Sequence, residues 1–159
     1  MSAGSGAELA LLYRVSPFFA VGGEAALSGF GGRGHGLVST ASGAARFFGV
    51  IGRVYFADDG AWDPYLALTL GAGALSLREA GLSAGESTTG FGGRVAGGLD
   101  YRLGSHVRVG AAASFAHWLA WSESRCLDEV CRREPAVYGR LLGFATLGLR
   151  VTASFGEVL

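Results

Sequence analysis

Three residues of the sequence have the types needed for acyl transfer. Ser114, His117 and Glu123 could serve as nucleophile, base and acid, the arrangement that an ester-hydrolysing enzyme needs. However, Ser114 and His117 are separated by three positions in an alternating segment, which directs them to opposite faces of a strand unless a bulge intervenes. His35 and His106 lie in a glycine-rich stretch and a turn, with no visible ligand partners. We therefore expect no enzymatic activity, no cofactor and no bound metal.

The only two cysteines, Cys126 and Cys131, lie in a polar segment without neighbouring histidines. A structural zinc site would need more ligands than this segment offers. We expect a disulfide across a surface loop, which requires an oxidising compartment. Two free thiols are the alternative, because spacing alone does not establish bonding geometry.

Most of the remaining charge chemistry lies on one face of alternating segments. Along each segment, positions that carry these charges alternate with apolar positions. A repeat of two residues is typical of a β-strand, whose successive side chains point to opposite faces. We expect them to line the interior of a closed sheet as a salt-bridged plug, and a polar conduit is the alternative. The residues of this predicted interior charge network are Glu8, Arg14, Glu24, Arg53, Arg94, Asp100, Arg102, Arg108 and Arg150.

The elements that position these charges are long strands. Residues 88–103 and 107–121 form two alternating runs around a Gly104–Ser105–His106 turn. They exceed the ~5–6 residues of ordinary strands and suit tilted strands that cross a bilayer, which need about 9–11 residues. Five further strands are predicted at 7–15, 18–27, 44–57, 65–77 and 138–155. In the third of these, Arg46 and Arg53 have opposite parity, so we place Arg46 at the rim, with a β-bulge as the alternative.

Composition supports a membrane protein built of strands. Half of the 159 residues are hydrophobic and only 16% are charged, against ~25% in typical soluble domains. No segment approaches the ~18 uninterrupted apolar residues of a spanning helix. The net charge of zero gives no indication of nucleic-acid binding. A soluble, lipocalin-like calyx is disfavoured because it would carry polar outer faces around an apolar cavity.

Connections between the predicted strands alternate between short turns and long loops, the long ones being residues 28–43, 78–87 and 122–136. That asymmetry is characteristic of outer-membrane barrels. The whole chain, residues 1–159, resembles as one domain the small bacterial outer-membrane β-barrel family, OmpA-like and opacity-protein-like. The alternating last strand, which ends at Phe155, looks like the C-terminal aromatic signal of that Gram-negative family. The resemblance implies outer-membrane lipids and the barrel-assembly machinery as partners.

The predicted fold is all-β, an antiparallel transmembrane β-barrel. We expect eight strands, of which seven can be recognised in this sequence. Barrels of this family have even strand numbers, with eight the smallest usual case. The N-terminus shows no recognisable secretory signal. We therefore expect that a signal peptide and a first strand are missing from this sequence. Parallel pairing of the first and last strands is the other way to close the ring.

Aromatic residues gather near strand ends, as expected of interfacial girdles. We expect an outer-membrane protein with a structural or surface-interaction role through its loops, and a narrow, porin-like pore or transporter is the alternative. The predicted interfacial aromatics are Tyr13, Trp62, Tyr65, Tyr101, Trp118, Trp121, Tyr138 and Phe155.

Overall fold

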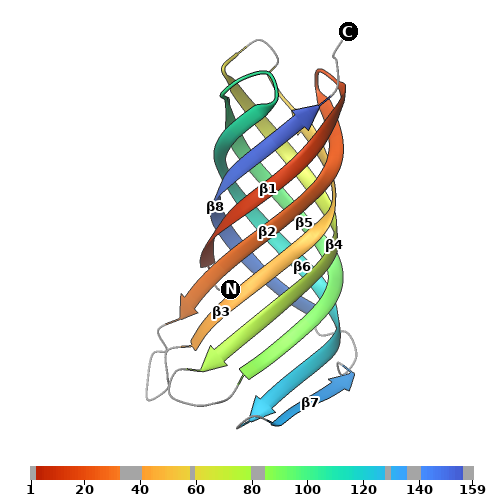
Figure 1. The fold of residues 1–159 in the computed structure, drawn as a ribbon, viewed down its shortest axis with the longest axis vertical. Coiled ribbons are helices and arrows are strands. Elements are labelled where there is room, and N and C mark those ends of the chain that lie inside the picture. Colours follow the sequence, from red (N-terminus) through yellow and green to blue (C-terminus); the bar gives the residue numbers. More distant parts are fainter. Residues whose placement is uncertain are drawn as a thin grey trace.

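A computed structural model shows an all-β chain whose strands wind around a common axis (Figure 1). The described residues are 3–32, 41–57, 60–79, 85–127, 130–135 and 141–155. Within them no helix is long and apolar enough to cross a membrane. The strands are β1 (Ala3–Ser16), β2 (Phe19–Gly32), β3 (Ala41–Tyr55), β4 (Trp62–Glu79), β5 (Gly85–Arg102), β6 (Val107–Leu127), β7 (Val130–Pro135) and β8 (Leu141–Phe155).

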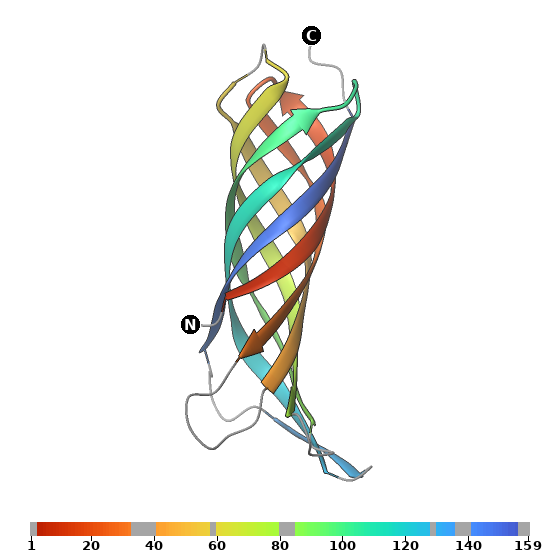
Figure 2. The same ribbon diagram turned by 90° about the vertical axis from the view of Figure 1, so that its left-hand side faces the viewer.

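Seven of these strands close into a ring, which confirms the predicted number of long strands. Neighbours pair antiparallel in the order β1 to β6 and then β8. The ring closes where β1 pairs with β8 in parallel, with Glu8 opposite Arg150. Parallel closure, the alternative raised by the odd strand count, is therefore the arrangement that the structure adopts. The seam is visible where the first and last strands run side by side (Figure 2).

The stagger of the ring fixes the tilt of its strands. Register partners can be followed once around the ring, starting at Ala3 of β1 and passing through β8, β6, β5, β4, β3 and β2. The path returns to β1 at Tyr13, which is ten residues further along the strand. Because strands lie about 4.8 Å apart and rise about 3.3 Å per residue, seven strands with this stagger tilt by roughly 45°. Each residue then advances about 2.3 Å along the axis, so 11 residues span about 25 Å.

The strands run further into the long-loop end than predicted. β2 continues to Gly32, and β6 continues to Leu127 and pairs with the short strand β7. The prediction that residues 122–136 form a loop was therefore wrong for most of this segment. Charged residues in this segment indicate a loop, but a polar hairpin outside the ring extends the ladder without burying them. This β6–β7 hairpin projects beyond the ring at the end opposite the short turns (Figure 1).

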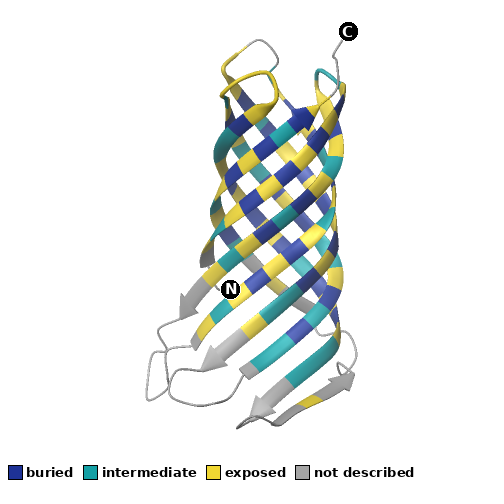
Figure 3. Ribbon diagram, in the orientation of Figure 1, coloured by how far each residue is buried: buried dark blue, intermediate teal, exposed yellow. Residues whose placement is uncertain are grey.

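Along every strand of the ring, buried residues alternate with more exposed ones (Figure 3). The predicted parity of β3 is correct: Arg53 is buried, Arg46 is exposed, and the register between them is continuous, so the bulge is absent. Irregularities lie instead between Arg14 and Ser16, and in β6 opposite the Thr89–Gly90 step.

Candidate functional site

The outer face of the ring is apolar over most of its height. Among the residues that the structure describes, twenty-nine large hydrophobic side chains are exposed, including Leu149 at 73% and Val50 at 70%. Among the described side chains of strands β1 to β5 and β8, Arg46 is the only charged one in the exposed class. Soluble monomers rarely expose contiguous apolar patches of more than a few hundred Å², so an apolar face of this extent is unusual for a soluble monomer.

The interior is ionic, and its central layer joins four strands. Arg94 of β5 donates hydrogen bonds to both Glu8 and Glu24. Arg150 of β8 also pairs with both carboxylates, and its closest approach to Glu8 Oε2 is 3.4 Å. Each of these four side chains is at least 94% buried. Two arginines therefore balance two carboxylates in this layer, which we call the central quartet (Glu8, Glu24, Arg94, Arg150).

Neutral hydroxyls add hydrogen bonds to the central quartet. Ser114 Oγ accepts hydrogen bonds from Arg94 Nε and Nη2, at 3.2 and 2.9 Å, and lies 2.6 Å from Thr146 Oγ1. Thr69 donates to Glu24 at 3.2 Å, and Arg150 donates to the Tyr65 hydroxyl at 2.8 Å. The short polar residues that alternate with alanine and glycine on the inner faces thus serve as partners for buried charges.

A second interior layer lies nearer the short turns. Arg53 Nη1 is 2.8 Å from Asp100 Oδ2, and both residues are fully buried. Thr152 accepts from Arg53 at 3.3 Å and donates to Asp100 at 3.4 Å. The Arg53 guanidinium also lies 4.3 Å from the centre of the Tyr65 ring, within the range of a cation–π interaction.

Asp63 organises a third layer at the short-turn mouth. Its carboxylate lies 2.7 Å from Arg108 Nε, 3.0 Å from Arg102 Nη2 and 3.5 Å from Arg14 Nη2. Asp63 is fully buried, whereas the Arg102 side chain keeps 31% of its surface exposed. All nine residues of the predicted interior charge network thus take part in these three layers, and Asp63 was missed. Asp63 lies two residues before Tyr65 and therefore faces the same side of the strand. It was missed because the predicted strand began at residue 65, three residues after the observed start at Trp62.

Apolar side chains fill the interior toward the long-loop end. Phe47 and Trp118 are 2% and 1% exposed and pack with buried alanines. Glycines make the space for the indole: a Cβ on Gly73 would lie 3.3 Å from both rings, and one on Gly92 would collide with Trp118. These two rings, which we call the Phe47–Trp118 plug, therefore occupy the interior on the long-loop side of the central quartet.

Two of the predicted interfacial aromatics lie inside the ring. Trp118 and Tyr65 are only 1% and 2% exposed, because they share the parity of the inward-facing residues. The interfacial interpretation of these two residues was therefore wrong, since proximity to a strand end was allowed to override the alternation. Tyr138 lies outside the described residues. Exposed aromatics at the short-turn end include Tyr13, Phe19, Phe56, Trp62, Tyr101 and Phe155, and Trp121 is exposed on β6.

The three residues considered for acyl transfer are not brought together. Ser114 points inward to Arg94 and Thr146, whereas His117 faces outward beside the Phe115 ring, with ring centres 6.2 Å apart. The irregularity in β6 lies beyond both residues, opposite the Thr89–Gly90 step. No group of three potential ligands for a metal ion occurs among the described residues.

The two cysteines face each other in backbone register. Cys126 of β6 pairs with Cys131 of β7, one step before the Leu127–Val130 pair that closes the hairpin. Directly opposed residues of antiparallel strands have Cα atoms about 4.5–5.5 Å apart, which is within the range that a disulfide spans. Their side chains lie outside the described part of the chain, so the disulfide stays a prediction.

Comparison with protein-family models, curated proteins and solved structures finds no match to this chain.

Proposed function

We propose that this protein is a small outer-membrane β-barrel whose outer face meets lipid and whose interior is closed. The observation that carries the proposal is the separation of chemistry between the two faces of one sheet. Large apolar side chains cover the outside, while ten charged residues are paired inside. At the bilayer midplane a lipid-facing arginine or lysine costs about 2–4 kcal/mol, so this segregation is what a membrane selects.

The apolar part of the outer face, which we call the apolar band, has two boundaries that support this placement. Exposed aromatic residues mark its short-turn end, and Arg46 marks its long-loop end. Tyr13 pairs with Phe155 and Trp62 with Tyr101 at the short-turn end, where aromatic side chains are exposed. With the tilt derived above, outward-facing Arg46 lies roughly 20 Å from this aromatic girdle along the axis. The apolar band is thus close to the ~25 Å of outer-membrane barrels.

We assign the protein a structural or surface-interaction role rather than an enzymatic one. The long-loop end, with its β6–β7 hairpin, would face the outside, and the short turns would face the periplasm, as in barrels with this loop asymmetry. The C-terminal strand would be the segment read by the barrel-assembly machinery. A narrow pore for small solutes is the alternative, but the paired arginines and the Phe47–Trp118 plug favour a closed interior.

An arginine scan of the outer face tests the membrane placement. We expect Leu68→Arg, in the middle of the band, to destabilise the protein in phosphatidylcholine vesicles by about 2–4 kcal/mol. Ala44→Arg, outward on β3 beyond Arg46, is the matched control and should cost about 0–1 kcal/mol. Stability is measured by urea unfolding, followed by the mobility of unboiled samples on gels. Equal tolerance of both variants, together with solubility without detergent, would reject the membrane barrel in favour of a soluble ring.

Orientation and closure are tested separately. A cysteine at exposed Arg132 of β7, in a background with Cys126 and Cys131 replaced by serine, should react with a membrane-impermeant maleimide on intact cells. Purified protein in planar bilayers should leave the conductance at its background value. Steady unitary currents would establish the pore instead, and labelling only after lysis would invert the assigned orientation.

A further inference from the structure

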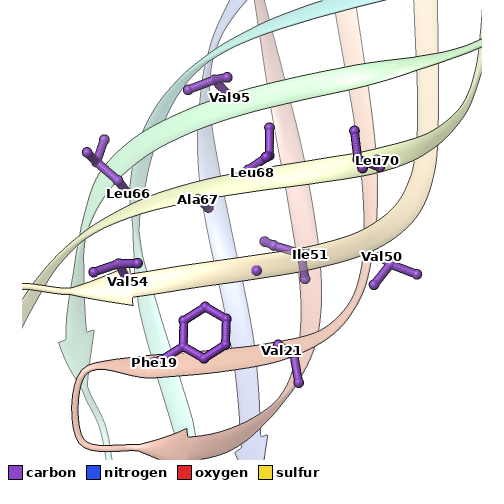
Figure 4. A pocket seen from close by; sticks show the side chains of 11 residues that line it. Phe19, Val21, Val50, Ile51, Val54, Leu66, Ala67, Leu68, Leu70 and Val95 are labelled. Carbon is purple, nitrogen blue, oxygen red and sulfur yellow. The ribbon is translucent and has the colours of Figure 1, made fainter.

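A groove about 620 Å³ in volume crosses the outer faces of β2, β3 and β4 (Figure 4). Gly52 forms its floor, because this residue lies between Val21 and Leu68 in register and lacks a side chain where both neighbours have one. A Cβ built on Gly52 would meet only the Phe19 ring, at 3.8 Å. The hollow is therefore a consequence of one glycine within an outward row of larger residues.

The chemistry of the groove restricts its occupant. Its side-chain lining is entirely hydrocarbon and includes Phe19, Val21, Val50, Val54, Leu66 and Leu70. No side chain of the lining can donate or accept a hydrogen bond or carry a charge. Valine side chains are stiff at χ1, so much of the wall is preformed. A polar ligand would gain nothing here, whereas a hydrocarbon chain would bury its surface without displacing any polar contact.

The position of the groove matches one leaflet of a bilayer. Its lower end is at Phe19, beside the short turn and within the exposed aromatic girdle, and its upper end is at Leu70. By register and tilt these ends are separated by roughly 15 Å along the axis. The hydrocarbon core of a bilayer is about 30 Å thick, so each leaflet contributes about 15 Å. The groove is continuous with the apolar band on both sides.

We propose that this groove is a specific seat for one acyl chain of a phospholipid in the leaflet at the short-turn end. The inference rests on the proposed membrane placement and adds to it a defined lipid site. The lipid headgroup lies at the level of the aromatic girdle, and the chain extends past Gly52 toward Leu70. A second copy of the protein is the competing occupant, but a stable interface buries about 800 Å² on each partner, and a narrow hollow floored by one glycine offers much less.

The test fills the groove and leaves the rest of the band unchanged. In Gly52→Leu the new side chain occupies the hollow, and it meets no backbone atom at its Cβ position. Gly23→Leu is the matched control, because Gly23 faces outward on β2, has open space at its Cβ position and does not line the groove. Each protein is folded in phosphatidylcholine vesicles, extracted into mild detergent and examined by native mass spectrometry.

We expect the unmodified protein and Gly23→Leu to retain one phosphatidylcholine molecule, and Gly52→Leu to retain about tenfold less, equivalent to about 1.4 kcal/mol. Equal retention by all three proteins, or none by the unmodified protein, would overturn the site. A dimer that only Gly52→Leu dissociates would assign the groove to a second copy and also overturn it. Membrane integration of the three proteins is scored separately by the gel-mobility assay, so failure of the membrane placement is distinguishable from failure of the lipid seat.

Discussion

Removal of the Arg94 side chain should be among the most damaging single changes to this ring. Arg94 pairs with Glu8 and Glu24 and also donates to Ser114. In Arg94→Met, which keeps most of the side-chain volume, two buried carboxylates would share Arg150 as their only counter-charge within the central quartet. Breaking a buried ion pair by removing one partner costs about 3–5 kcal/mol, because the remaining charge is left uncompensated.

The charge balance of the quartet gives this prediction a rescue variant. Adding Glu8→Gln to Arg94→Met leaves Arg150 with Glu24, so one arginine again faces one carboxylate. We expect the double variant to recover at least half of the loss, whereas Glu8→Gln alone should be destabilising because it leaves two arginines with one carboxylate. The coupling energy would then be at least half of the Arg94→Met loss, about 1.5–2.5 kcal/mol, plus whatever Glu8→Gln costs alone.

Urea unfolding in vesicles measures these differences. With a slope of about 2 kcal/mol per molar urea, a loss of 3–5 kcal/mol lowers the midpoint by roughly 1.5–2.5 M. Arg46→Gln serves as the control, since Arg46 is exposed on the outer face and should shift the midpoint by no more than about 0.25 M, the equivalent of 0.5 kcal/mol. Additive effects of Arg94→Met and Glu8→Gln, without rescue, would refute the reasoning that charge balance across the lumen stabilises the ring.

Three further predictions address the plug, its glycines and the hairpin. Trp118→Ala should cost about 3–5 kcal/mol, as for other buried tryptophans, and Trp121→Ala less than half of this in the same urea assay; similar losses would contradict the assigned parity. Gly92→Ala should abolish folding, scored as loss of the folded band on unboiled gels, because its Cβ would collide with the Trp118 backbone and side chain; Gly23→Ala is the tolerated control. When the denatured protein is alkylated without reductant, mass spectrometry should find Cys126 and Cys131 unmodified, because they form a disulfide. Alkylation of both cysteines under these conditions would show that they are free thiols.

The alternation of the sequence was sufficient to predict the seven strands of the ring and the facing of most of their residues. Each inward arginine between Arg14 and Arg150 could be placed from parity alone, because a charge on the wrong face would meet the exposed apolar surface. The same rule places Trp118 and Tyr65 inside, against their prediction as interfacial aromatics. These two residues were misplaced because proximity to a strand end was given more weight than a period of two, whereas the 122–136 error came from treating charge as a sign of a loop.

Other features depend on the neighbouring strands, which the sequence of one strand does not specify. Asp63 becomes the partner of three arginines only because β1, β5 and β6 bring Arg14, Arg102 and Arg108 to the same mouth. The groove at Gly52 likewise follows from the register that places Val21 and Leu68 on either side of it. The alternation along one strand determines which face a residue occupies. The register between neighbouring strands determines its position along the axis of the ring and therefore its partners.

The central quartet includes a contact across the seam at which the seven-stranded ring closes. The β1–β8 seam is the one parallel joint of the ring, and parallel pairing is slightly less stable per residue than antiparallel pairing. Glu8 and Arg150 are register partners across this seam and lie in ionic contact at 3.4 Å. Because side chains alternate between faces, a slip of the seam by one residue would turn one of these charges toward the apolar outer surface. Alternation thus excludes a slip by one residue, and the contact between Glu8 and Arg150 favours this register over a slip by two. Glu24 extends the ion pair to the adjacent strand β2, and Arg94 extends it to β5.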